Sequence, residues 1–132
     1  MIELSLREVA KICHGKILPG SPAELRIRGL SSDSRSAQPD ALFVALSGPH
    51  FDAHDFVAQA RSNGAAAVLV SQAMAEPGVL VTDTLQALQD LAAAWRQRCP
   101  ARVIGVTGSC GKTTVKEILA AILQETGPGI AT

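Results

Sequence analysis

Aromatic residues, net charge and long apolar runs are all lacking in this sequence of 132 residues. Aromatic residues make up 3% of it and tyrosine is absent, so stacking platforms for single-stranded nucleic acid are not expected. Twelve Lys and Arg residues balance twelve Asp and Glu residues, which gives no electrostatic reason to expect binding to nucleic acid or an anionic membrane. No apolar run approaches the roughly 20 residues that a membrane-spanning helix needs.

Cysteine is also sparse, because Cys13, Cys99 and Cys110 are the only three and stand far apart in the sequence. An odd number of cysteines without a Cys-x-x-Cys pair argues against a disulfide framework or a zinc site. The amino terminus carries charges throughout and lacks the apolar core of a signal peptide. We therefore expect a cytoplasmic protein without membrane insertion.

Three short apolar runs indicate the fold class. They lie at 41–46, 65–70 and 78–83 and alternate with helical patterns. Strands that are apolar throughout are typical of sheets covered on both faces. The sequence therefore predicts an α/β fold with an at least partly parallel sheet.

Helix ends can be predicted from capping residues. Ser5 and Glu8 form a capping box that begins a first helix, for which Gly15 is the expected stop. Asp55 is expected to cap a second helix over 56–63, and Asp83 or Thr84 a third. The side chains expected to face inward from the third helix are Leu85, Leu88, Leu91, Ala92 and Trp95. A domain boundary is expected before this third helix, which gives domains of 1–82 and 83–132.

The segment "GVTGSCGKTT" (105–114) is typical of a phosphate-binding loop. An apolar strand is predicted before it, over 101–107, and an amphipathic helix behind it, over 113–126. Glycines allow the backbone to approach phosphate oxygens, and the helix dipole adds positive charge at that point. The strict P-loop pattern would place glycine at position 106, which is Val106 here.

Each residue of this loop has an expected role. Lys112 can place its charge between the outer phosphates of ATP, and the Thr113 hydroxyl can bind Mg²⁺. Cys110 is either a small side chain tolerated in the loop or a reactive thiolate near a helix terminus. The expected ATP-binding residues are Thr107, Gly108, Ser109, Cys110, Gly111, Lys112, Thr113 and Thr114.

This variant loop, T-G-x-x-G-K-T-T, resembles that of the Mur ligases. Three upstream stretches are similar to the amino-terminal uridine-nucleotide domain of that family: "SSDSR" (31–35), "ALFVALSGPHFDAHDF" (41–56) and "GAAAVLV" (64–70). The continuation "KTTVKEIL" is most similar to the branch that adds D-alanyl-D-alanine to UDP-N-acetylmuramoyl tripeptide. The expected architecture is a small α/β UDP-binding domain followed by the first helix, strand, P-loop and helix of an ATPase domain.

The resemblance implies an ATP-dependent amide ligase of peptidoglycan precursor synthesis. The family phosphorylates the carboxylate of a UDP-muramoyl peptide to an acyl phosphate, which the incoming amine then attacks. ATP and Mg²⁺ are the implied cofactors. Because the metal-binding residues of the family lie beyond the segment that the resemblance covers, we expect this chain alone to be catalytically inactive.

The loop Asp33-Ser34-Arg35 lies in the part that receives the UDP portion in this family. Ser34 can hydrogen-bond a uracil edge or a phosphate, and Arg35 can pair with a diphosphate. The alternative is a self-bonded turn in which Arg35 pairs with Asp33 or Asp40. His50 and His54 are interpreted as surface residues, and Asp52 and Asp55 as turn or cap residues.

Other readings remain open at this point. The sibling ligase that adds the third peptide residue, a folylpolyglutamate synthase and a small P-loop kinase are alternatives within the enzyme class. A stand-alone module that binds a UDP-sugar or a nucleotide is an alternative without chemistry. The apolar stripe from Val115 to Leu123 needs cover, which predicts some self-association.

Overall fold

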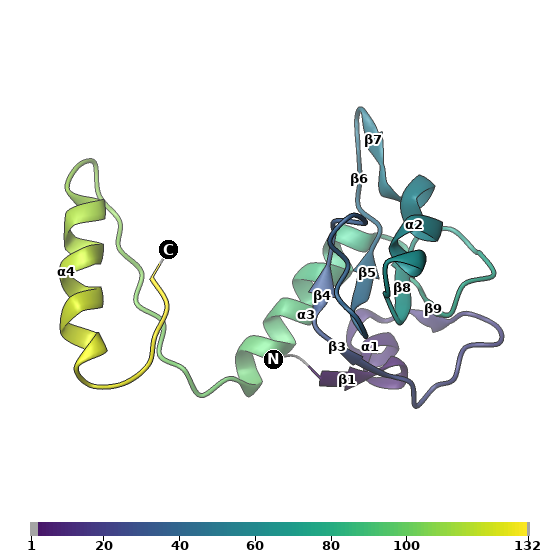
Figure 1. The fold of residues 1–132 in the computed structure, drawn as a ribbon, viewed down its shortest axis with the longest axis horizontal. Helices are drawn as coiled ribbons and strands as arrows, with labels where there is room; N and C mark the ends of the chain where they lie inside the picture. Colours follow the sequence, from purple (N-terminus) through teal and green to yellow (C-terminus); the bar gives the residue numbers. More distant parts are fainter. Residues whose placement is uncertain (1–2, 132) are drawn as a thin grey trace. The chain divides into compact units, whose positions relative to one another are not determined.

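The computed structural model describes residues 3–131 (Figure 1). The chain forms two compact units that divide between Cys99 and Pro100. The helical elements of the first unit are α1 (Leu6–Cys13), the 3-10 helix η1 (Ala53–Phe56), α2 (Val57–Ser62) and α3 (Thr84–Arg98). Its strands are β1 (Glu3–Ser5), β2 (Lys16–Ile17), β3 (Arg26–Arg28), β4 (Leu30–Ser31), β5 (Leu42–Val44), β6 (Ser47–Gly48), β7 (Phe51–Asp52), β8 (Ala67–Val70) and β9 (Gly78–Leu80).

A mixed five-stranded sheet in the order β2-β9-β8-β5-β4 forms the centre of this unit. Strands β4, β5, β8 and β9 are parallel, whereas β2 runs antiparallel to β9. The predicted α/β fold with a partly parallel sheet is therefore confirmed. Because parallel strands end at the same edge of a sheet, the loops that follow β4, β5 and β8 meet at that edge.

Strands β5 and β8 are covered on both faces. In β5, Leu42 and Val44 belong to a hydrophobic cluster with residues of α1 and α3, whereas Phe43 belongs to a second cluster with residues of α2. The side chains of β8 alternate between the same two clusters. Every residue of the two strands is buried, as their continuous apolar runs predicted.

The backbones of β8 and β9 approach closely at Gly78 in β9. A Cβ built at this position would lie 2.0 Å from the carbonyl oxygen of Val68 in β8. No side chain fits there, so glycine is required for these two strands to pair.

The capping box of α1 is confirmed. The Ser5 hydroxyl accepts a hydrogen bond from the Glu8 amide at 3.2 Å, and the Ser5 amide donates to Glu8 Oε2 at 2.8 Å. The expected stop at Gly15 is wrong by one residue, because His14 adopts the left-handed conformation (φ 55°) that ends the helix. Gly15 is needed for a different reason, since a Cβ there would lie 2.7 Å from the carbonyl oxygen of Leu80.

The predicted cap of α2 is also wrong. Asp52, not Asp55, is the capping residue, and it caps η1 by accepting the His54 amide at 3.0 Å. Helix α2 then begins at Val57 without a side-chain cap, because the chain enters it directly from η1.

Helix α3 begins as predicted, and its inward face was predicted in part. Asp83 Oδ1 accepts the amides of Leu85 and Gln86 at 2.9 and 3.2 Å, which confirms this cap. The buried residues are Thr84, Ala87 and Leu91, whereas Leu85 is 54% exposed. Leu91 is in the core and Leu88 packs against it, as predicted. Apolar spacing missed the small residues Thr84 and Ala87, and it wrongly placed Leu85 and Ala92, which are exposed.

Contacts group α3 with the first unit, because it packs against α1. The expected domain boundary lies 17 residues earlier, at 82/83, and compactness within this chain does not test it. That boundary therefore stays a prediction about domain organisation.

The second unit contains helix α4 (Lys112–Gln124), which confirms the predicted helix after the loop. The predicted strand over 101–107 is wrong, because these residues have no regular secondary structure. A strand exists only by pairing with a neighbour, and within 3–131 nothing pairs with this segment. None of the described helices is long and apolar enough to cross a membrane.

Candidate functional site

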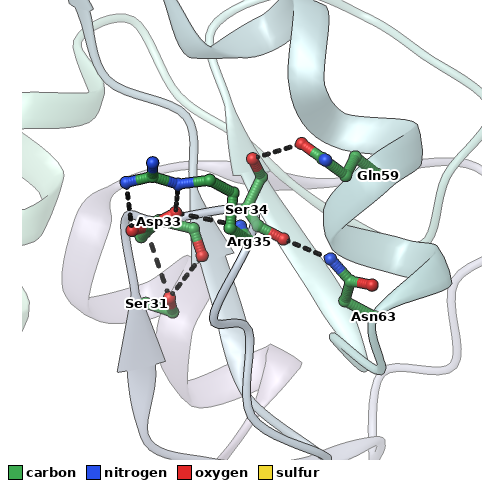
Figure 2. A network of polar contacts seen from close by, with 6 residues as sticks. All are labelled: Ser31, Asp33, Ser34, Arg35, Gln59 and Asn63. Carbon is green, nitrogen blue, oxygen red and sulfur yellow. Dashed lines mark hydrogen bonds and ion pairs between the residues drawn. The ribbon is translucent and has the colours of Figure 1, made fainter.

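The segment Asp33-Ser34-Arg35 follows β4 at the carboxyl edge of the sheet. The Ser31 hydroxyl donates to the Asp33 carbonyl oxygen at 3.0 Å, and Asp33 Oδ1 accepts the Arg35 amide at 2.9 Å (Figure 2). Such side-chain to backbone bonds two residues apart stabilise a tight turn without regular structure. The turn presents its side chains at the edge where α/β sheets bind ligands.

Arg35 pairs with Asp33 through two bonds. Its Nε and Nη2 donate to Oδ1 and Oδ2 of Asp33, both at 3.0 Å. These hydrogen bonds lower the pKa of Asp33 and raise the pKa of Arg35. The Arg35 side chain is 81% exposed, so the pair is a surface ion pair that contributes little to stability. Of the two interpretations offered by the sequence, the free chain adopts the self-bonded turn, with Asp33 rather than Asp40.

Ser34 lies between this turn and α2. Its hydroxyl donates to Gln59 Oε1 at 2.7 Å, and Asn63 Nδ2 donates to the Ser34 carbonyl oxygen at 2.7 Å (Figure 2). Ser34 is 8% exposed. Gln59 and Asn63 were not predicted as site residues, although their spacing of four residues places both on one side of a helix.

An open cavity of about 610 Å³ adjoins the turn. One part of its lining is polar or charged and the other is apolar or aromatic. The lining residues are Ser32, Asp33, Ser34, Arg35, Phe43, Phe51, Ala53, Phe56 and Gln59. All of them belong to the first unit. This composition fits a ligand that has both a flat apolar part and an anionic part.

Two aromatic rings form part of this cavity wall. Phe51 of β7 and Phe56 of η1 stack with ring centroids 5.6 Å apart and an interplanar angle of 15°. They are 55% and 39% exposed. The low aromatic content argued against stacking platforms for nucleic-acid strands, and did not reveal this local pair.

His54 was interpreted as a surface residue, and this is wrong. Its side chain is 4% exposed, and Nδ1 lies 2.6 Å from Asp52 Oδ1. On the other side of the ring, Nε2 accepts the Ser71 amide at 3.0 Å. Hydrogen bonds from the His54 amide and ring lower the pKa of Asp52. The motif "FDAHDF" gave no periodicity from which this burial could be predicted.

The phosphate-loop residues 107–114 all lie in the second unit. Gly111 precedes α4 with a φ of 77° and no side chain caps the helix, so the amides of its first turn face no capping side chain. A Cβ at Gly111 would meet nothing within 4 Å, and Lys112, Thr113 and Cys110 are exposed. This open, uncapped helix terminus fits an anion, as P-loops require. Residues 3–131 contain no group of three His, Cys, Asp or Glu side chains that could hold a metal.

A family model described as "Mur ligase family, catalytic domain" matches residues 26–96. The chain is similar to UDP-N-acetylmuramoyl-tripeptide–D-alanyl-D-alanine ligase of Escherichia coli, with 44% identity over 129 residues. That match covers 96% of this chain and 28% of the relative. The corresponding ligase of Bacillus subtilis is 41% identical, over 93% of this chain and 28% of its own length. The chain thus spans slightly more than a quarter of these relatives.

Solved structures of this kind also match. A crystal structure of MurF from Acinetobacter baumannii is 35% identical with a TM-score of 0.85, covering 97% of this chain and 29% of that one. MurF ligase from Thermotoga maritima, crystallised with ADP, is 36% identical with a TM-score of 0.64. That match covers 74% of this chain and 23% of the other.

Proposed function

Because this chain belongs to the Mur ligase family, we propose that it supplies the substrate-binding and phosphate-loop portion of an ATP-dependent ligase. The reaction is the joining of D-alanyl-D-alanine to UDP-N-acetylmuramoyl tripeptide in peptidoglycan precursor synthesis. The observation that carries the proposal is the 44% identity to a ligase with this named activity, over 96% of the chain.

The cavity beside Asp33-Ser34-Arg35 is the proposed site of the UDP portion. Arg35 can exchange the Asp33 carboxylate for a diphosphate, which offers the same paired oxygen acceptors with greater charge. The single Ser34 hydroxyl proton is donated to Gln59, so toward a ligand this oxygen acts as an acceptor. It can accept a hydrogen bond from the N3–H of a uracil ring, whereas ionised phosphate oxygens have no hydrogen to donate to it.

The loop 107–114 is the proposed site of the ATP phosphates. Uncapped amides at the start of α4 and the charge of Lys112 would bind the phosphate oxygens. Thr113 would place its hydroxyl on Mg²⁺, which neutralises the developing charge during phosphoryl transfer.

The proposed chemistry has two steps. A carboxylate oxygen of the tripeptide attacks the γ-phosphorus of ATP, ADP leaves, and an acyl phosphate forms. The amine of D-alanyl-D-alanine then attacks the acyl carbon, inorganic phosphate leaves, and a proton is lost as the amide forms. Phosphoryl transfer requires metal ions and several positioned donors, of which the described residues supply only a part.

We therefore expect the 132 residues alone not to turn over. The test supplies ATP, Mg²⁺, UDP-N-acetylmuramoyl tripeptide and D-alanyl-D-alanine, and measures ADP. ADP release is expected to be no faster than that of a Lys112→Ala control. Sustained release above that control, with amide product, would contradict the expectation of inactivity.

A second candidate is a stand-alone module that binds a UDP-sugar or a nucleotide. The observation that favours it is that every residue lining the cavity lies in the first unit. Ligand binding by the first unit is measured as a rise in the midpoint of thermal unfolding, followed by the fluorescence of Trp95. This residue lies in α3 and therefore reports on the first unit. Stabilisation by UDP alone, without ATP, is expected for a working first unit.

A cytoplasmic location and self-association through the exposed apolar residues of α4 stay predictions.

A further inference from the structure

Two of the three phenylalanines in this chain are exposed side by side. Phe43 is fully buried in the sheet, as expected for such a large apolar side chain. Phe51 and Phe56 instead stack on each other at the cavity and keep 55% and 39% of their surfaces exposed. Exposed aromatic surface that lines a cavity is available to stack against a flat ring.

The segment that carries the two rings is held to the preceding strand through its first three residues. Strand β7 pairs with β6, with Phe51 opposite Gly48 and Asp52 opposite Ser47. Ala53, the next residue, donates its amide to the Leu46 carbonyl oxygen at 2.9 Å and begins η1, which leads to Phe56.

The buried His54 ring connects this segment to the end of β8. Because Ser71 donates its amide to Nε2, that nitrogen carries no proton, and Nδ1 must carry the proton that Asp52 accepts. Both bonds are made only by this one tautomer of the neutral ring. His54 therefore links the segment between the two phenylalanines to the central sheet through these hydrogen bonds.

We propose that the Phe51–Phe56 pair is the stacking platform for the uracil ring, and that His54 is the positioning residue that holds the platform in place. This assignment rests on the proposed binding of the UDP portion. Phenyl rings recognise the flatness of a base, while the acceptor oxygen of Ser34 in the same cavity recognises its edge. The guanidinium of Arg35, also in the cavity lining, recognises the anionic tail.

The test compares UDP with 5,6-dihydrouridine diphosphate, in which the base keeps its N3–H but loses its planar π system. Binding of both is measured by isothermal titration calorimetry in a Lys112→Ala background, so that the loop 107–114 contributes little. Because base stacking is expected to contribute about tenfold in affinity, UDP should bind roughly tenfold more tightly than the dihydro analogue. The affinity for UDP divided by the affinity for the dihydro analogue is called the ring preference.

Phe51→Leu and Phe56→Leu should each reduce the ring preference toward one, with little change in the binding of the dihydro analogue. Leu85→Ala is the matched control, because Leu85 is 54% exposed and lies outside the cavity. It should leave both affinities unchanged. A ring preference that survives both phenylalanine changes would overturn the platform while the proposed UDP site stands. Absence of UDP binding in the parent chain would overturn the proposed site itself.

His54 is tested by the same ratio. His54→Ala should remove most of the ring preference, whereas His54→Gln, whose Oε1 can accept the Ser71 amide, should restore part of it. If His54 only stabilises the fold, both ligands weaken together and the ratio stays near tenfold, which would overturn its positioning role. Should His54→Ala fail to fold, His54→Asn, which keeps only the Asp52 partner, takes its place and should lose the ring preference.

Discussion

The two compact units differ in what holds them together. The first buries side chains on both faces of a sheet, whereas α4 of the second has no buried residue. Several large apolar residues of the second unit are exposed, among them Val103, Ile118 and Ile122 at 71%, 56% and 57%. Yet the loop in this second unit has the more specific sequence motif. The strength of a functional motif and the stability of the segment that carries it are therefore separate properties.

The difference has a physical cause. A phosphate loop needs glycines, an uncapped helix terminus and a lysine within about ten residues, all of which are local. A sheet core needs side chains from strands and helices far apart in the sequence. A helix of 13 residues without packing partners is marginal in water, so its stability depends on what covers its apolar face.

Matched leucine truncations should show the largest difference between the units. Leu69 of β8 is fully buried, so Leu69→Ala should lower the free energy of unfolding by about 2–5 kcal/mol. Leu123 of α4 is 43% exposed, and Leu123→Ala should change it by no more than about 0.5 kcal/mol. Urea unfolding followed by Trp95 fluorescence measures both. Equal losses would mean that α4 shares the core of the first unit.

Cysteine reactivity should separate the units next. Cys13 is buried, donates to the Ala87 carbonyl oxygen at 3.6 Å, and has its pKa raised by burial to about 11. Cys110 is exposed in the loop. Because the thiolate is the reactive form, iodoacetamide at neutral pH should modify Cys13 roughly 100-fold or more slowly than Cys110. Mass spectrometry of peptides measures the rates, which should converge in denaturant. Similar rates in the native chain would contradict the burial of Cys13.

Removal of the loop charge should affect ligand binding but not stability. Lys112→Ala should weaken ATP binding by about tenfold, as expected for loss of one charged hydrogen bond. The midpoint of urea unfolding should not change, because Lys112 is exposed and belongs to the second unit. Calorimetry of ATP binding measures the first effect. Unchanged affinity would show that this lysine does not contact the phosphates.

The smallest expected effect is a pH dependence at the capping box of α1. The Ser5 amide bond lowers the pKa of Glu8 in the folded chain. A lowered folded pKa means that the stabilisation is complete above the unfolded pKa, roughly 4.3. It is lost as pH falls from there through the lower folded pKa. Urea unfolding of the wild type and Glu8→Gln between about pH 6 and 3 should therefore converge toward acid. A constant difference would exclude this contribution from Glu8.

Much of the fold was predictable because its determinants are local or strongly patterned. The runs that became β5, β8 and β9 are continuous apolar stretches, and the caps at Ser5 and Asp83 have specific residue types at fixed spacing. The absence of a strand over 101–107 could not be predicted, since strand pairing depends on partners outside the segment. The inward face of α3 depends on the small residues Thr84 and Ala87, which apolar periodicity does not weigh.

The candidate site was predictable only in part. The turn Asp33-Ser34-Arg35 followed from a family resemblance, and its self-bonded form was one of the two interpretations. The partners Gln59, Phe56 and Ser71 come from other elements and reach the site only through the parallel sheet order. A short loop sequence contains no information about which distant strand ends beside it.

The central claim is that the first unit provides the stability of the chain, whereas the second contains a loop that local sequence determines. Residue-resolved amide hydrogen exchange of the 132-residue chain tests this claim most directly. Amides of β5 and β8 should exchange slowest, at the rate of global unfolding, whereas those of α4 should exchange through local opening that is orders of magnitude faster. Protection of α4 equal to that of β8 would contradict this account.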